Sequence, residues 1–96
     1  MQEIPNKENL LNKERSQEIV QNARDANALL QKELIVNHSE QTLLCKRMQI
    51  MKDFMSDLPA SDPQYNMIAL ALHMDQIELH ELKARESALV ERLEQL

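Results

Sequence analysis

The side chains with most scope for chemistry are histidine and cysteine, and their spacing argues against a catalytic or metal site. His38 and Cys45 are seven residues apart, and so are His73 and His80. Seven helical residues cover about 10.5 Å along the axis. That distance is too long for a nucleophile and its base or for two histidines on one metal ion. We therefore interpret His73 and His80 as solvent-exposed, and we do not expect His38 and Cys45 to form a nucleophile pair.

The carboxylates and the short motifs lead to the same conclusion. Many acidic residues lie three or four positions from a Lys or Arg, as Glu81 does from Arg85, and such spacing supports helices. The sequence has no glycine, which removes the glycine-rich loops that hold phosphates, and it has no HExxH, CxxC or glycine-framed serine. We expect no enzyme activity, no catalytic or metal-binding residue, and no cofactor.

The composition predicts a protein made of helices. Hydrophobic residues make up 43% of the 96 residues and aromatic residues 2%, whereas strands favour aromatic and β-branched residues. The net charge of -5 argues against a nucleic-acid partner. The chain contains no run of about 20 apolar residues of the kind a membrane span requires. The single Cys45 suits a reducing compartment, so we expect a cytoplasmic location.

The prolines divide the sequence into two long helices. Pro59 disfavours helix at the residue before it, and Asp62 followed by Pro63 is a strong signal for a new helix, with Ser61 as an alternative capping residue. We predict an all-α fold in one domain, with a flexible N-terminus (1–7), a long helix (8–58), a turn (59–62) and a second helix (63–96). A short turn between long helices favours an antiparallel hairpin.

A heptad pattern runs along each helix. With the heptad positions labelled a to g, apolar residues at a and d are typical of a coiled-coil seam. In the first helix the pattern extends from Val20 and Ala23 to Leu58, and in the second from Tyr65 to Leu96. The central residues of the predicted hairpin seam are Leu34, Leu44, Met48, Met51, Met55, Leu72, Leu79, Leu82 and Leu89.

Polar residues interrupt this seam at several a and d positions. They include Asn37, Gln41, Asp75 and Glu86. Folding about the turn brings Asn37 near Glu86, and either Lys46 or Arg47 near Asp75. Polar groups in a seam weaken it and often set its register, so one hypothesis is that these pairs lock the alignment. The alternative is a wet or splayed seam at these levels.

Each helix carries a second apolar stripe away from the seam. The residues concerned are Leu29, Val36, Leu43, Ile50 and Phe54 in the first helix, and Met67, Leu70, Met74 and Ile77 in the second. One hairpin buries one stripe per helix, so the second stripes need another partner. We predict a non-catalytic protein-binding module, a coiled-coil adaptor or assembly subunit. It completes a four-helix bundle either as a homodimer or with a helical partner, and the remaining alternative is a folded-back monomer.

Five of the six methionines fall between Met48 and Met74. They form either a gap-filling core or an adaptable groove for a client helix. Being small, acidic and helical, the chain resembles in general style the type III secretion chaperones for helical filament subunits. That resemblance rests on no specific motif, and it implies a cytoplasmic chaperone that sequesters a helical client. A coiled-coil regulator that titrates a partner is a further alternative.

Overall fold

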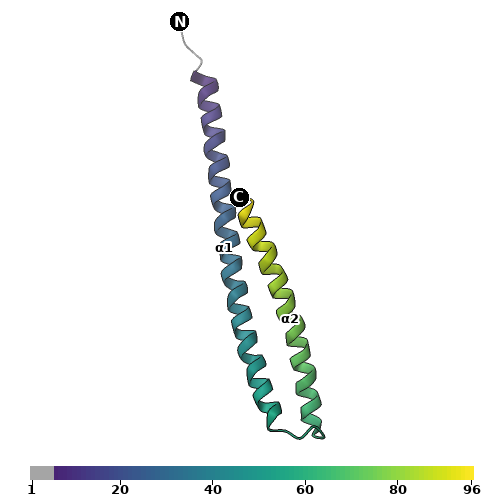
Figure 1. Cartoon of the computed structure of the whole chain (residues 1–96). Helices are drawn as coiled ribbons and strands as arrows, with labels where there is room; N and C mark the ends of the chain where they lie inside the picture. Colours follow the sequence, from purple (N-terminus) through teal and green to yellow (C-terminus); the bar gives the residue numbers. More distant parts are fainter. Residues whose placement is uncertain (1–5) are drawn as a thin grey trace.

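The chain forms an antiparallel hairpin of two α-helices, which confirms the predicted fold class. A computed structural model describes the backbone of residues 6–96 and the side chains of residues 12–96. Helix α1 spans Asn6–Ser56 and helix α2 spans Pro63–Glu94, and no strand occurs between residues 6 and 96. The helices run side by side from the turn, and α1 extends well beyond the end of α2 (Figure 1).

The helix ends differ from the predicted boundaries by two residues at three places. Helix α1 begins at Asn6 instead of residue 8, so Asn6 and Lys7 are helical, and the rest of the predicted flexible N-terminus lies outside the described residues. It ends at Ser56, because Pro59 disfavours helix at Leu58. The amide of Leu58 instead donates to the Met55 carbonyl at 3.1 Å, which tightens the last turn. Helix α2 ends at Glu94.

The start of α2 is capped as the sequence predicted. Asp62 is the N-cap, and its side chain accepts a hydrogen bond from the Gln64 amide at 2.8 Å. Pro63 occupies the first helical position, where its missing N–H costs nothing. Asp62 therefore serves as the cap, while Ser61, the alternative capping residue, is exposed in the turn.

The hairpin is a rod with one continuous seam. Its extents are 93 × 16 × 15 Å, and its radius of gyration is 24.9 Å, about twice the roughly 12 Å of a compact domain of this length. The buried apolar side chains are Leu30, Leu44, Met48 and Leu89, and none of the described side chains is fully enclosed. A rod of this kind leaves much of each helix surface in contact with solvent.

The seam follows the heptad register. All nine of the central seam residues predicted above are buried or half-buried. At the end of the hairpin away from the turn, α2 no longer covers α1, because α2 is the shorter helix. Val20 and Ala23 are therefore exposed, although they continue the heptad pattern. Leu96 lines a shallow hollow there together with Val20, Ala23 and Asn27.

Candidate interaction surface

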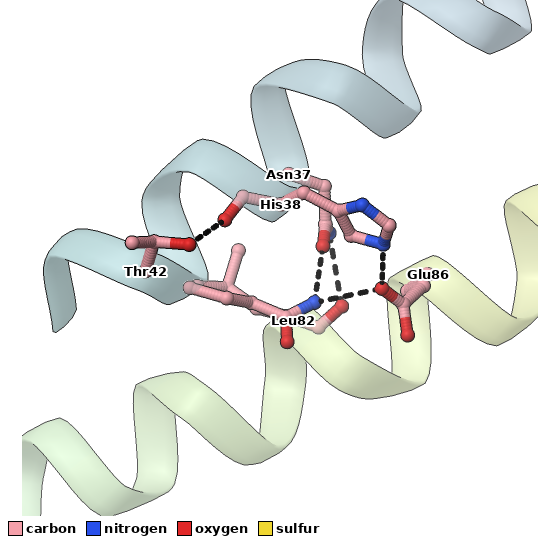
Figure 2. A network of polar contacts seen from close by, with 6 residues as sticks. Asn37, His38, Thr42, Leu82 and Glu86 are labelled. Atoms are coloured by element: carbon pink, nitrogen blue, oxygen red, sulfur yellow. Dashed lines mark hydrogen bonds and ion pairs between the residues drawn. The ribbon is translucent and has the colours of Figure 1, made fainter. Parts of the chain in front are cut away.

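A polar cluster occupies the middle of the seam (Figure 2). Asn37 is only 3% exposed, and its amide donates to the Leu82 carbonyl at 2.9 Å. The Gln41 side-chain amide donates to Asn37 Oδ1 at 2.6 Å and to Glu86 Oε2 at 3.2 Å. Asn37 and Glu86 are thus linked through Gln41, so the side chain that joins the predicted pair is itself one of the predicted polar residues.

His38 belongs to this cluster, and the sequence analysis did not predict its contact with Glu86. Its Nε2 contacts Glu86 Oε2, although the imidazole is largely exposed. His38 lies at the edge of the seam, directly after Asn37 in the sequence. That position is the sequence signal from which a contact with Glu86 could have been predicted. Cys45 lines the same shallow groove as His38, but His38 is engaged with Glu86 instead of the thiol. Cys45 is free and exposed.

A second polar pairing lies nearer the turn. Arg47 Nε and Nη2 donate to the two oxygens of Asp75 at 2.7 and 2.8 Å, and Arg47 also approaches Glu78 at 3.7 Å. The hydrogen bonds with Asp75, followed by its negative charge, raise the pKa of Arg47 above its ordinary value. The buried Asp75 is therefore satisfied by Arg47, and it forms no hydrogen bond or ion pair with Lys46, the other residue that the sequence placed near it.

The ion pairs identify one side of the hairpin. Arg47 and Glu78 occupy g positions of their helices, and so do Glu33 and Arg85, whose side chains approach to 3.5 Å. Both pairs bridge α1 and α2 on the side where the g positions lie, which we call the g face. His38, at an e position, contacts Glu86 on the opposite side.

The outer apolar stripes are exposed along their whole length. The nine side chains predicted to bind a partner are between 44% exposed, for Ile77, and 70% exposed, for Met67. By contrast Leu44, in the seam, is 5% exposed. Contacts within the hairpin therefore leave both stripes largely uncovered.

Most of these side chains border the g face. On α1, Leu29, Val36, Leu43 and Ile50 occupy c positions next to the g row, and Phe54 is itself at g. On α2, Met67 and Met74 are at c, whereas Leu70 and Ile77 are at f, farther round the helix. The sequence analysis recognised the stripes but not that both border the same side of the hairpin.

The methionines near the turn divide between the two environments. Met48 is buried and Met51 and Met55 are half-buried in the seam, while Met67 and Met74 are exposed. Further exposed apolar side chains were absent from the predicted set: Ile19, Ile35 and Val90. Ile35 and Val90 lie at b and e positions, on the other side from the g face, so they do not extend the stripes.

No group of three or more His, Cys, Asp or Glu among the described residues is placed to hold a metal ion. Neither helix, over its described residues, is long and apolar enough to cross a membrane. The sequence matches no protein-family model, and no curated protein or solved structure is significantly similar to it.

Proposed function

We propose that this chain is a non-catalytic protein-binding module that completes a helical bundle with another polypeptide. The observation that carries the proposal is the exposure of nine large apolar side chains in heptad register, including Leu43 at 67% and Ile50 at 69%. Scattered apolar residues on a surface are ordinary, but contiguous apolar patches mark sites of interaction. Here the spacing is that of a second helix-packing stripe.

The area of the stripes is large enough to matter. Fully burying one such side chain is worth about 1.5–3 kcal/mol, which at about 25 cal/mol per Å² corresponds to about 60–120 Å². Because these nine side chains are 44–70% exposed, they present roughly 300–650 Å² over the two stripes, as much as the roughly 300–600 Å² of the largest apolar patch on a typical monomer. Partner helices would remove this surface from water.

The seam supplies a second argument. Its middle is occupied by Asn37, Gln41 and Glu86, and its buried apolar side chains are few. Polar residues at a and d positions lower the stability of a coiled coil. A hairpin with such a seam gains from a partner that binds only the folded form, which suits an adaptor or assembly subunit. The exposed thiol of Cys45 suits a reducing compartment, and we propose a cytoplasmic location.

Site-specific photocrosslinking in the cells that make the protein tests the proposal. A benzoylphenylalanine at Leu43 or Ile50 should form a covalent adduct with another polypeptide. The same residue at Lys46, which is also exposed on α1 but lies on its outer, polar side, serves as the control and should form none. If adducts are absent at Leu43 and Ile50, or are equally frequent at Lys46, the proposed function is wrong.

The mass of the adduct separates the possible partners. An adduct of two copies of this chain indicates self-assembly, and an adduct with a different helical protein indicates a heteromeric complex, as a chaperone or a regulator would form. Both results support a protein-binding module.

A further inference from the structure

The g face combines the two features that an interface between helices needs. Ion pairs cross it between α1 and α2, at Arg47–Glu78 and Glu33–Arg85. Exposed apolar side chains border it on both helices. The opposite side has no comparable stripe among the described residues, because its e and b rows are mostly polar around His38 and Thr42.

We propose that the partner is a second copy of this chain, stacked on the g face with the two turns at the same end. This inference rests on the proposed function and identifies the partner that covers the g face. The two-fold axis runs parallel to the long axis of the hairpin, and the result is a four-helix bundle. In this arrangement α1 of each copy lies against α2 of the other, antiparallel to it, as it does within one hairpin.

Charge supports a second copy as the occupant. Because the two-fold axis places α1 against the partner's α2 at the same level, each Arg47 lies beside a second copy of Glu78. Each Glu33 likewise lies beside a second copy of Arg85. The pairs seen within the hairpin can therefore be shared across the interface, where Arg47 and Glu33 each gain a second neighbour of opposite charge.

The exposed apolar area supplies a large part of the interface that a stable dimer needs. Seven of the outer side chains lie at c or g positions and border the g face: Leu29, Val36, Leu43, Ile50, Phe54, Met67 and Met74. Because they are 48–70% exposed, at about 60–120 Å² for a whole side chain they offer roughly 250–500 Å² per copy. The aliphatic stems of the charged g residues add to this. A standard interface buries about 800 Å² per partner.

The distribution of apolar residues selects the orientation. On α2 the apolar part of the stripe is confined to the half near the turn, at Met67 and Met74, and its next c position is Glu81. With the turns at the same end, each residue of α1 lies at the same height along the rod as the same α2 residues in both copies. Ile50 and Phe54 of one copy then meet Ala71 and Met67 of the other. A head-to-tail stack over the full length would place Met67 and Met74 against the charged half of α2 in the other copy.

Light-scattering mass of the purified full chain is the first measurement. At tens of micromolar the expected mass is twice 11.2 kDa. A mass of 11.2 kDa would overturn the inference while leaving the proposed function open to a different partner. That outcome combined with a heteromeric photocrosslink at Leu43 would show that the function is right and the occupant wrong.

Substitutions then locate the face. Ile50→Asp and Leu43→Asp should each weaken the dimer by more than about tenfold in dissociation constant, because each places an unpaired charge in the interface. Ser39→Asp and Gln76→Asp, which are exposed away from the g face, should leave the dissociation constant unchanged. Helix content by circular dichroism is checked for each variant. A dimer that tolerates Ile50→Asp and Leu43→Asp does not use this face.

Spin labels test the orientation. The label is attached at Ala60→Cys in the turn, in a Cys45→Ser background. The distance between the two labels of a dimer should be short, because it is limited by the width of a bundle in which neighbouring helix axes are about 8–10 Å apart. Diluting the label with unlabelled protein should remove the signal. A separation comparable with the 93 Å length of the hairpin would overturn the same-end arrangement.

Discussion

At the scale of single residues, the molecule depends on how it satisfies polar side chains in a narrow seam. Asn37 and Asp75 are both buried, and each has a defined partner on the other helix. Asn37 reaches a backbone carbonyl, which is available at any residue type, whereas Asp75 reaches the side chain of Arg47. The two positions therefore respond differently to substitution.

Asn37→Ala should lower the free energy of unfolding by about 1–3 kcal/mol. The change removes the donor to the Leu82 carbonyl and the acceptor of the Gln41 amide, in a site that is 3% exposed. Urea denaturation at one fixed protein concentration measures the effect. Asn22→Ala, on an exposed part of α1, is the matched control and should change stability little. Equal effects at the two positions would contradict a structural role for the Asn37 bonds.

Asp75→Leu should raise the melting temperature and weaken the specification of register. A buried Leu at this d position adds about 1.5–3 kcal/mol of apolar burial. Arg47 tolerates the loss because its side chain is 59% exposed and remains hydrated. Thermal unfolding and the homogeneity of mass measured by light scattering report the two effects.

Gln76→Leu, the exposed neighbour, is the control for Asp75→Leu and should not stabilise the hairpin. If Asp75→Leu leaves both stability and oligomeric state unchanged, and Glu86→Leu does the same, the register hypothesis is wrong.

At the scale of elements, the turn between α1 and α2 is specified by a few local contacts. Pro59 ends α1 early, and Asp62 with Pro63 starts α2. These residues act through backbone conformation and one side-chain hydrogen bond, so their effect should be largely independent of the outer stripes.

Asp62→Ala should lower the free energy of unfolding by about 0.5–2 kcal/mol, because the Gln64 amide loses its acceptor. Ser61→Ala is the matched control. It lies one residue earlier in the same turn and does not cap α2, so its effect should be close to zero. Chemical denaturation of both variants at equal concentration makes the comparison. A larger loss of unfolding free energy in Ser61→Ala than in Asp62→Ala would mean that Ser61, and not Asp62, caps α2.

At the scale of the whole molecule, the two helices have unequal lengths, and their packing is correspondingly uneven. The described side chains of α1 from Asn12 to Asp25 are all exposed, whereas from Leu30 onwards the a and d side chains are buried or half-buried and those between them are exposed. A helix without tertiary packing is marginal in water. Local stability should therefore fall along α1 toward its N-terminal side.

Hydrogen exchange followed by mass spectrometry should show this gradient. Amides of residues 12–24 should exchange much faster than those of residues 36–50, since packing against α2 protects the second segment. Residues 84–94 of α2 lie against α1 and serve as an internal control that should be protected. Uniform protection along α1 would mean that residues 12–24 are covered by another chain.

The sequence by itself determined the helical class, the position of the turn and the residues of the seam. Each of these depends on local preferences: the absence of glycine and the scarcity of aromatic residues, the Asp62–Pro63 start, and the heptad spacing of residues such as Leu44 and Leu89. Such signals act within a few residues of the chain and need no knowledge of the other helix.

The tertiary structure decided which polar groups meet and where the apolar stripes lie relative to one another. Arg47, and not Lys46, pairs with Asp75, and His38 joins Glu86, although neighbouring side chains were equally available in sequence. Val20 is left exposed because α2 ends before fully covering it. These outcomes depend on the rotation and level of one helix against the other. Interactions between residues far apart in the chain set both.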